Sequence, residues 1–158
     1  MNRLLAITLL AFATLLSGCA STPRGPQFVQ QPSPTEAATL YVFRLSTPPY
    51  ARKPDIRING IVVAELPTNS YFTVSVPPGK YEIKSDYGLL DNLFLSKSTI
   101  VNAMAGKSYF VEFTGKLGIY GTAVSYGAGI VAGESPVAPD GIKNCTLVKA
   151  DAAQVQPQ

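Results

Sequence analysis

The chain has 158 residues, with 13 lysines and arginines against 10 aspartates and glutamates, and it contains no histidine. A charge this close to balance excludes the strongly basic surface that nucleic-acid binding needs, so we expect no nucleic acid among its partners. The lack of histidine removes the commonest general base and the commonest metal ligand, so we expect no enzyme activity, no metal and no cofactor.

The first 18 residues are typical of a cleaved signal peptide. Arg3 supplies the positive charge at the start, and an apolar run over residues 4–16 follows it. This run is shorter than the roughly 20 residues of a membrane span, and no stop-transfer sequence comes after it. We therefore expect residues 1–18 to be removed from the mature protein.

The leader ends in Leu16-Ser17-Gly18-Cys19, which resembles the lipobox of bacterial lipoproteins. This resemblance implies that a signal peptidase recognises Leu16, Ser17 and Gly18, and that Cys19 receives diacylglycerol and further acyl chains such as palmitate. Two or three chains would hold the protein stably, since each buried CH₂ contributes about 0.8 kcal/mol. Ala20 then indicates the outer membrane, facing the periplasm, with the inner membrane and the cell surface as alternatives. An ordinary secretory peptide is the other interpretation of the motif.

Two polar segments flank a single predicted domain. Residues 19–38 are rich in proline, glutamine, serine and threonine, which predicts a flexible linker after the lipidated cysteine. Fully extended, this linker would reach at most about 60 Å. Residues 151–158 are expected to form a disordered tail. The domain itself is predicted to span residues 39–150, enough chain to bury a core.

Short runs of β-branched and aromatic residues predict strands throughout residues 39–150. Apolar and polar residues alternate on both sides of Asn59-Gly60, which predicts a hairpin over residues 55–66. The other predicted strands cover residues 40–45, 70–76, 80–85, 96–102, 107–114 and 145–149. Because no segment shows helical periodicity, we predict an all-β fold. An antiparallel immunoglobulin-like or transthyretin-like sandwich of about seven strands fits this spacing.

Tyr81 and Tyr109 each follow a glycine turn at a short distance. In such a place the ring can pack inward while the hydroxyl bonds to nearby backbone. This arrangement resembles the corner tyrosine of immunoglobulin-like domains.

Five motifs carry a resemblance to a known family. They are LYVFR at residues 40–44, ING at 58–60, NSYF at 69–72, PPGKY at 77–81 and AGKSYFV at 105–111. Together they resemble the bacterial domain-of-unknown-function family 2846 over about residues 39–115, and the PPGKY turn is similar to that of PEGA-type surface modules. The resemblance implies an extracytoplasmic β-sandwich without a known active site. After Gly115 the sequence departs from the family pattern.

The sequence has one notable basic cluster, formed by Arg44, Arg52, Lys53 and Arg57, with Tyr50 beside it. If these side chains converge, they predict a patch that binds anionic lipid, lipopolysaccharide, peptidoglycan or another envelope protein. Arg44 and Arg57 fall on predicted strands, whereas Arg52 and Lys53 fall in the loop between them. Charges that protect sheet edges from aggregation are the alternative interpretation.

Residues 115–133 contain six glycines, and residues 117–133 carry no charge. Ser125, Gly129 and Gly133 follow one another at intervals of four, a spacing that allows close packing of membrane helices. The segment is therefore a candidate element for assembly or membrane insertion. A hairpin weakened by glycine, or a loop over the sandwich, is the simpler interpretation.

Three further features give only weak indications of chemistry. The sequence around Ser125 approaches a nucleophile elbow but lacks its first glycine, and no histidine is present to activate the serine. Asp86 and Asp91 could share a calcium ion, although two carboxylates are a small ligand set. Cys145 is the only thiol left once Cys19 is acylated, so we expect it to be buried or paired between chains.

Overall fold

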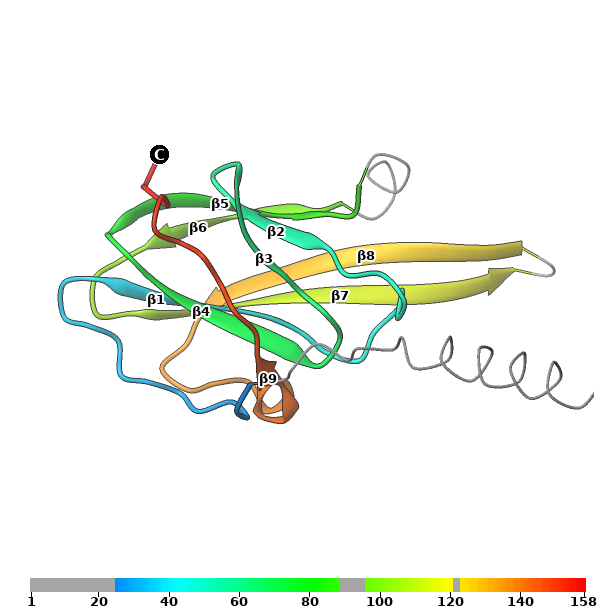
Figure 1. Ribbon diagram of the computed structural model, residues 1–158, viewed down its shortest axis with the longest axis horizontal. Helices are drawn as coiled ribbons and strands as arrows, with labels where there is room; N and C mark the ends of the chain where they lie inside the picture. Colours follow the sequence, from blue (N-terminus) through cyan, green and yellow to red (C-terminus); the bar gives the residue numbers. More distant parts are fainter. Residues whose placement is uncertain (1–24, 89–95, 121–122) are drawn as a thin grey trace, which may run out of the picture.

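The computed structural model describes residues 25–88, 96–120 and 123–158, in which two β-sheets pack face to face (Figure 1). In chain order the elements are β1 (Ala38–Arg44), β2 (Asp55–Ile58), β3 (Ile61–Glu65), β4 (Ser70–Val76), β5 (Gly79–Asp86), β6 (Ser98–Ala103), β7 (Ser108–Tyr120), β8 (Ala123–Glu134), the 3-10 helix η1 (Asp140–Asn144) and β9 (Thr146–Leu147). The predicted all-β sandwich is confirmed. It has nine strands within the described ranges, where about seven were expected.

The two sheets differ in strand direction. The five-stranded sheet has the order β8-β7-β1-β4-β9, and the four-stranded sheet has the order β3-β2-β5-β6. Every pairing in the four-stranded sheet is antiparallel, as predicted. In the five-stranded sheet, β1 runs parallel to β7 and β4 runs parallel to β9, so this sheet is mixed. The expectation of a wholly antiparallel sandwich is wrong for these two pairs, because their strands come from distant parts of the chain and no hairpin links them.

Strand β1 lies in the middle of the five-stranded sheet and is buried along its whole length. Leu40 and Val42 point into the space between the sheets, while Tyr41 and Phe43 lie on the opposite face in a second apolar cluster. Burial on both faces explains why residues 40–43 of this strand are all apolar instead of alternating with polar residues.

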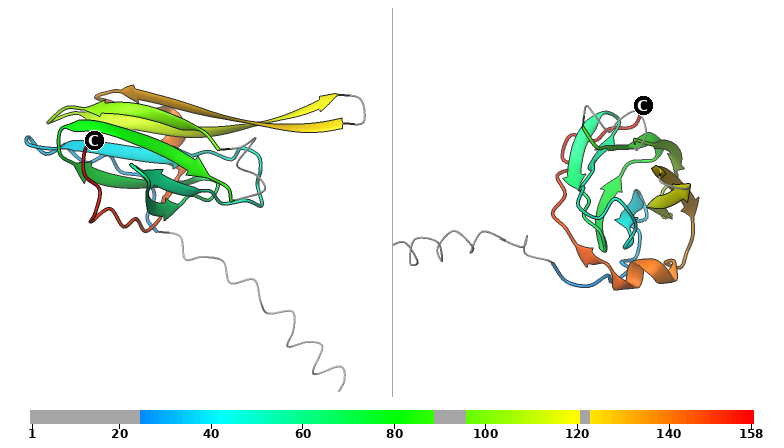
Figure 2. Two further views of the ribbon diagram at one scale, coloured as in Figure 1. Left: turned by 90° about the horizontal axis from the view of Figure 1, so that it is seen from above. Right: turned by 90° about the vertical axis from the view of Figure 1, so that its right-hand side faces the viewer.

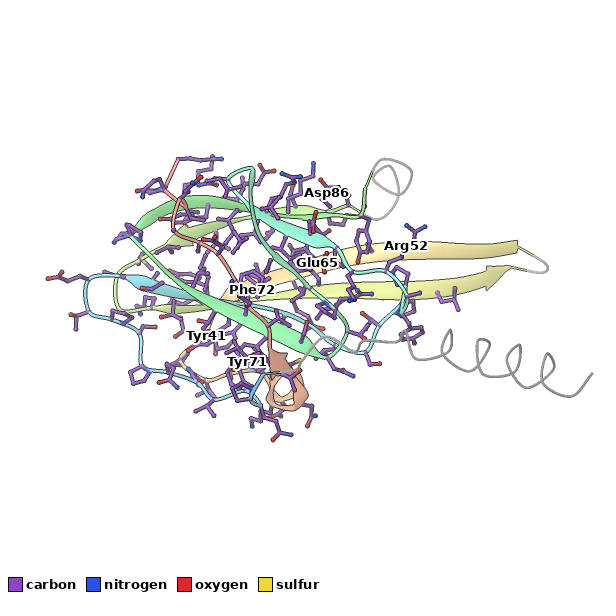
Figure 3. The ribbon with its side chains drawn as sticks, in the orientation of Figure 1. Tyr41, Arg52, Glu65, Tyr71, Phe72 and Asp86 are labelled. Atoms are coloured by element: carbon purple, nitrogen blue, oxygen red, sulfur yellow. The ribbon has the colours of Figure 1, made fainter. Side chains whose placement is uncertain are left out.

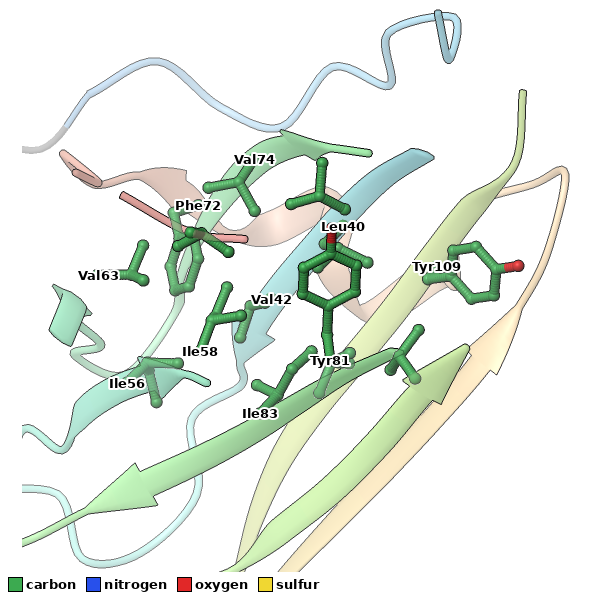
Figure 4. Packing of buried hydrophobic residues seen from close by; sticks show 14 of the residues in the cluster. Leu40, Val42, Ile56, Ile58, Val63, Phe72, Val74, Tyr81, Ile83 and Tyr109 are labelled. Atoms are coloured by element: carbon green, nitrogen blue, oxygen red, sulfur yellow. The ribbon is translucent and has the colours of Figure 1, made fainter. Parts of the chain in front are cut away.

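The main core fills the space between the sheets (Figure 4). Phe72 of β4 packs there with Ile56 and Ile58 of β2, and all three side chains are fully buried. The inward packing predicted for Tyr81 and Tyr109 is confirmed. The Tyr81 hydroxyl donates a hydrogen bond of 2.7 Å to the Pro77 carbonyl, and the Tyr109 hydroxyl accepts one of 3.1 Å from the Met104 amide.

The predicted hairpin at residues 55–66 is present as β2 and β3. Asn59 and Gly60 both have positive φ angles, of 50° and 83°, which is what a two-residue hairpin turn with an Asn-Gly sequence requires. Asn59 also donates from its side-chain amide to the Gln156 carbonyl, and its side-chain oxygen accepts from the Glu82 amide. The turn therefore holds two other parts of the chain in place.

The segments expected to be flexible are packed against the sandwich wherever the structure describes them. The amide of Gly25 donates to the Leu147 carbonyl at 3.0 Å, and the Phe28 ring meets the rings of Tyr41 and Tyr71 edge-on. In the tail, Val155 is buried in the main core. Burial of these apolar side chains offsets the entropy of ordering the chain, so the predicted linker and tail are shorter than residues 19–38 and 151–158.

Strands β7 and β8 form the longest pairing of the molecule, with a register that runs from Tyr109↔Glu134 to Tyr120↔Ala123. The hairpin they form extends well past the other strands at one end of the sandwich (Figure 2). It contains the glycine-rich residues 115–133, apart from residues 121–122, which lie outside the described ranges. The hairpin interpretation of this segment is thus confirmed for the part that the structure describes.

Candidate functional site

The predicted lipidation site, Cys19, and the recognition residues Leu16, Ser17 and Gly18 lie outside the described residues. The structure does, however, fix where the chain joins the domain. The backbone is hydrogen-bonded to the domain from Gly25 onward, and residues 27 and 146 form a β-bridge. Only five residues lie between Cys19 and Gly25, so the Cα atoms of these two residues can be at most about 20 Å apart. A lipid on Cys19 would hold the domain much nearer to a bilayer than the 60 Å expected from the sequence.

Arg44 does not contribute its charge to a surface patch, because its side chain is 1% exposed. Its Nη1 donates to the carbonyls of Arg52 at 2.7 Å and Leu66 at 3.5 Å. Its Nη2 donates to the carbonyls of Thr47 at 3.0 Å and Pro49 at 2.6 Å. Burial lowers the pKa of Arg44. The guanidinium therefore binds the loop of residues 45–54 from within.

This loop is also fixed by β7. The Gly115 amide donates to the Thr47 side-chain hydroxyl at 3.2 Å, and a β-carbon at Gly115 would overlap the carbonyl of Pro48. The glycine is thus needed for the close approach of loop and strand. Together, Arg44 and Gly115 fix the shape of the loop that carries Arg52 and Lys53.

Three residues of the predicted patch lie exposed on this loop, namely Tyr50, Arg52 and Lys53. The Tyr50 side chain is 64% exposed, and Figure 3 places Arg52 at the same end of the sandwich as the projecting hairpin. Arg57 lies apart from them on β2, where its Nε forms a 3.1 Å ion pair with Asp86. The structure thus brings together three of the five predicted residues.

An open groove of about 380 Å³ lies where residues 30–33 pass the start of β7 and the end of β8. The Lys107 ammonium pairs there with Glu134 at 3.0 Å, and the hydroxyls of Ser33 and Ser108 are 2.8 Å apart. Sequence analysis missed this groove, because the segment at residues 30–33 was taken for a free linker. The Ser135 hydroxyl, which also lines the groove, donates to the Val137 carbonyl at 2.6 Å.

A smaller hollow of about 180 Å³ adjoins the groove and contains Glu112 among apolar residues such as Phe43, Phe110 and Val131. Burial raises the pKa of Glu112. Among the described residues, no group of three or more histidines, cysteines, aspartates or glutamates lies close enough to hold a metal ion.

Cys145 is fully buried and unpaired in the second apolar cluster, in agreement with the burial predicted for it. Its Sγ lies 3.8 Å from the Arg44 carbonyl oxygen. Burial raises the pKa of this thiol to about 11, so it is protonated at neutral pH and is a poor nucleophile.

The remaining candidates do not assemble into a site among the described residues. Asp86 is paired with Arg57, while Asp91, its predicted calcium-binding partner, lies outside the described ranges. Ser125 lies on β8, so the strand-to-helix turn of a nucleophile elbow is not formed there. The helix-packing interpretation of the intervals between Ser125, Gly129 and Gly133 is wrong for the same reason. No helix in the described part of the chain is long and apolar enough to cross a membrane.

One family of known sequences matches most of the domain. The sequence model of a family described as Protein of unknown function (DUF2846) matches residues 34–128, more than half of the chain. The chain belongs to this family. The DUF2846 region covers β1 to β7 and the first residues of β8, so the family pattern continues past Gly115, where the sequence resemblance was expected to end. No curated protein and no solved structure matches the chain.

Proposed function

We propose that this DUF2846 protein is a lipoprotein of the bacterial outer membrane, anchored by acyl chains on Cys19 and facing the periplasm. In this proposal the sandwich acts as a non-catalytic structural or binding module of the cell envelope. The observation that carries the proposal is the lipobox-like sequence Leu16-Ser17-Gly18-Cys19, placed only six residues before the packed domain begins at Gly25. The proposed tether is thus too short to let the domain move far from the bilayer.

Metabolic labelling with palmitate tests the anchor, and the second cysteine of the chain provides a matched control. We expect the native chain and a Cys145→Ser variant to incorporate the label, because Cys145 is a buried thiol inside the domain. We expect Cys19→Ser to incorporate none. Equal labelling of Cys19→Ser and the native chain would exclude Cys19 as the lipidated residue.

In this proposal the short tether keeps the domain, and with it the loop that carries Tyr50, Arg52 and Lys53, near an anionic membrane surface. Each exposed cation near such a surface contributes about 1 kcal/mol, and this contribution falls as the salt concentration rises. An aromatic side chain beside the cations suits the interface between headgroups and water. We therefore propose anionic lipid headgroups as the ligands of this loop; peptidoglycan or another envelope protein is the alternative.

Hydrogen exchange in reconstituted vesicles tests this contact. In the native chain, we expect the backbone amides of residues 50–53 to exchange more slowly in anionic vesicles than in zwitterionic ones, and salt should remove the difference. The double variant Arg52→Glu/Lys53→Glu should show no difference between the two vesicle types. A matched charge reversal at two exposed lysines of β5, Lys80→Glu/Lys84→Glu, should behave like the native chain. If both double variants lose the effect equally, the loop has no special role.

For the glycine-rich hairpin we propose a second role, in assembly. This role is favoured over membrane insertion because the segment is strand β8 with an unpaired outer side instead of an apolar helix. The role does not depend on the lipid anchor.

A further inference from the structure

Strand β8 has a free edge, meaning a side on which its backbone donors and acceptors meet no other strand. It is the last strand of the five-stranded sheet, and within the described residues only β7 pairs with it. Strand β6, the last strand of the four-stranded sheet, lies beside it, so both sheets end on the same side of the sandwich (Figure 2). One side of the molecule therefore presents two strands, each with a free outer edge.

The hydrogen-bonding pattern shows which groups face this edge. The Ser135 amide donates to the Ser108 carbonyl at 3.1 Å, which makes residues 108 and 135 a bonded pair at the base of the hairpin. Bonded and non-bonded pairs alternate along an antiparallel ladder. By the register of β7 and β8, the amides and carbonyls of Ala128, Ile130 and Ala132 therefore point away from β7. These groups form the regularly spaced row that another strand would need.

The composition of β8 does nothing to block such pairing. Natural edge strands are usually protected by lysine, proline or a bulge. Residues 123–133 contain no charged residue and no proline, and the pairing of β7 with β8 runs without a register shift. Gly127, Gly129, Val131 and Gly133 lie on the face of β8 away from the main core, because Ile130 and Ala132 pack against that core; Val131 is 64% exposed. A second strand can approach this edge without steric or electrostatic conflict.

The charge pattern favours a second copy of the same chain as the occupant. When β8 of one copy pairs antiparallel with β8 of a second copy, the two Glu134 side chains lie at opposite ends of the ladder. The like charges therefore stay apart. Strand β6 also carries no charge, so the neighbouring edges can approach as well. A two-fold axis perpendicular to the sheets brings both pairs of edges together, as a symmetric dimer requires.

We propose that β8 of one copy pairs antiparallel with β8 of a second copy, which joins the two five-stranded sheets into one. The outward amides of Ala128, Ile130 and Ala132 donate across the two-fold axis. The interface is built from backbone hydrogen bonds and the small side chains around them.

Sedimentation equilibrium of the full chain in density-matched detergent tests the proposal, together with hydrogen exchange on the same samples. We expect the mass to double as the concentration rises. In the dimer, exchange at Ala128, Ile130 and Ala132 should slow by about tenfold or more, while Gly129, Val131 and Gly133, bonded to β7, stay protected throughout.

Two exposed valines provide the matched variants. Val131 lies on β8 and Val137 lies just after it, with exposures of 64% and 68%. Val131→Lys should weaken the association by about tenfold or more without loss of the monomer fold, and Val137→Lys should leave it unchanged. A chain that stays monomeric at all concentrations overturns the proposal. So does a dimer in which the outward amides exchange freely, or one that Val131→Lys leaves intact.

Discussion

Replacement of Arg44 by methionine should destabilise the protein by about 3 to 5 kcal/mol, because it leaves buried carbonyls without a donor. Methionine keeps most of the apolar stem but removes the guanidinium, which binds the carbonyls of Arg52, Thr47, Pro49 and Leu66. Urea unfolding monitored by circular dichroism measures this loss.

Arg57→Met is the matched control, because Arg57 is the other arginine within the sandwich sheets. Its side chain is 35% exposed and its partner is the carboxylate of Asp86, so the loss should be below about 1 kcal/mol. If the two variants lose the same stability, the buried guanidinium does not hold the loop of residues 45–54.

The second large effect is expected at Gly115, where alanine should cost about 3 kcal/mol. Its β-carbon would overlap the Pro48 carbonyl, which is backbone and cannot rotate away, so the loop of residues 45–54 must shift. The same unfolding measurement applies. Chemical shifts of the amides in this loop would show the displacement directly.

Gly127→Ala tests whether this cost is specific to Gly115. A β-carbon at Gly127 has no heavy atom within 4 Å apart from its chain neighbours, so the substitution should be neutral or slightly stabilising. A Gly115→Ala variant as stable as Gly127→Ala would show that the loop does not pack tightly against β7.

The elements that the sequence predicted well are those whose bounds are set by neighbouring residues, such as a turn or a flanking proline. Asn59-Gly60 specifies its own turn through two positive φ angles, so the hairpin of β2 and β3 was found at nearly its true bounds. The bounds of Ser70–Val76 were predicted correctly, since Pro67 and Pro77 confine a run of β-branched and aromatic residues.

Elements that depend on distant partners were missed or shortened. Glycine has a weak preference for strands, so the sequence left residues 115–133 open between a weakened hairpin and a loop; pairing along the whole register of β7 and β8 decides for the hairpin. The parallel pairing of β1 with β7 also has no local signal. In the proline-rich segment before β1, Phe28 was the one large aromatic residue, and it could have indicated that this part of the chain packs against the domain.

The sequence predicted only part of the candidate site, because only part of it is formed by residues close together in the chain. Tyr50, Arg52 and Lys53 belong to one loop, so their proximity follows from the sequence. Arg44 follows four apolar residues on a strand buried on both faces, and alternation cannot show where such a side chain points. Only the fold shows that its charge serves the loop backbone instead of the surface.

The anchor on Cys19 is the central claim, and the mass of the mature protein purified from bacterial membranes tests it most directly. We expect an N-terminal peptide that begins at Cys19 and carries the added mass of a diacylglyceryl group, with or without a further acyl chain on its amine. A free thiol at Cys19, or a mature chain that retains residues 1–18, would contradict the account.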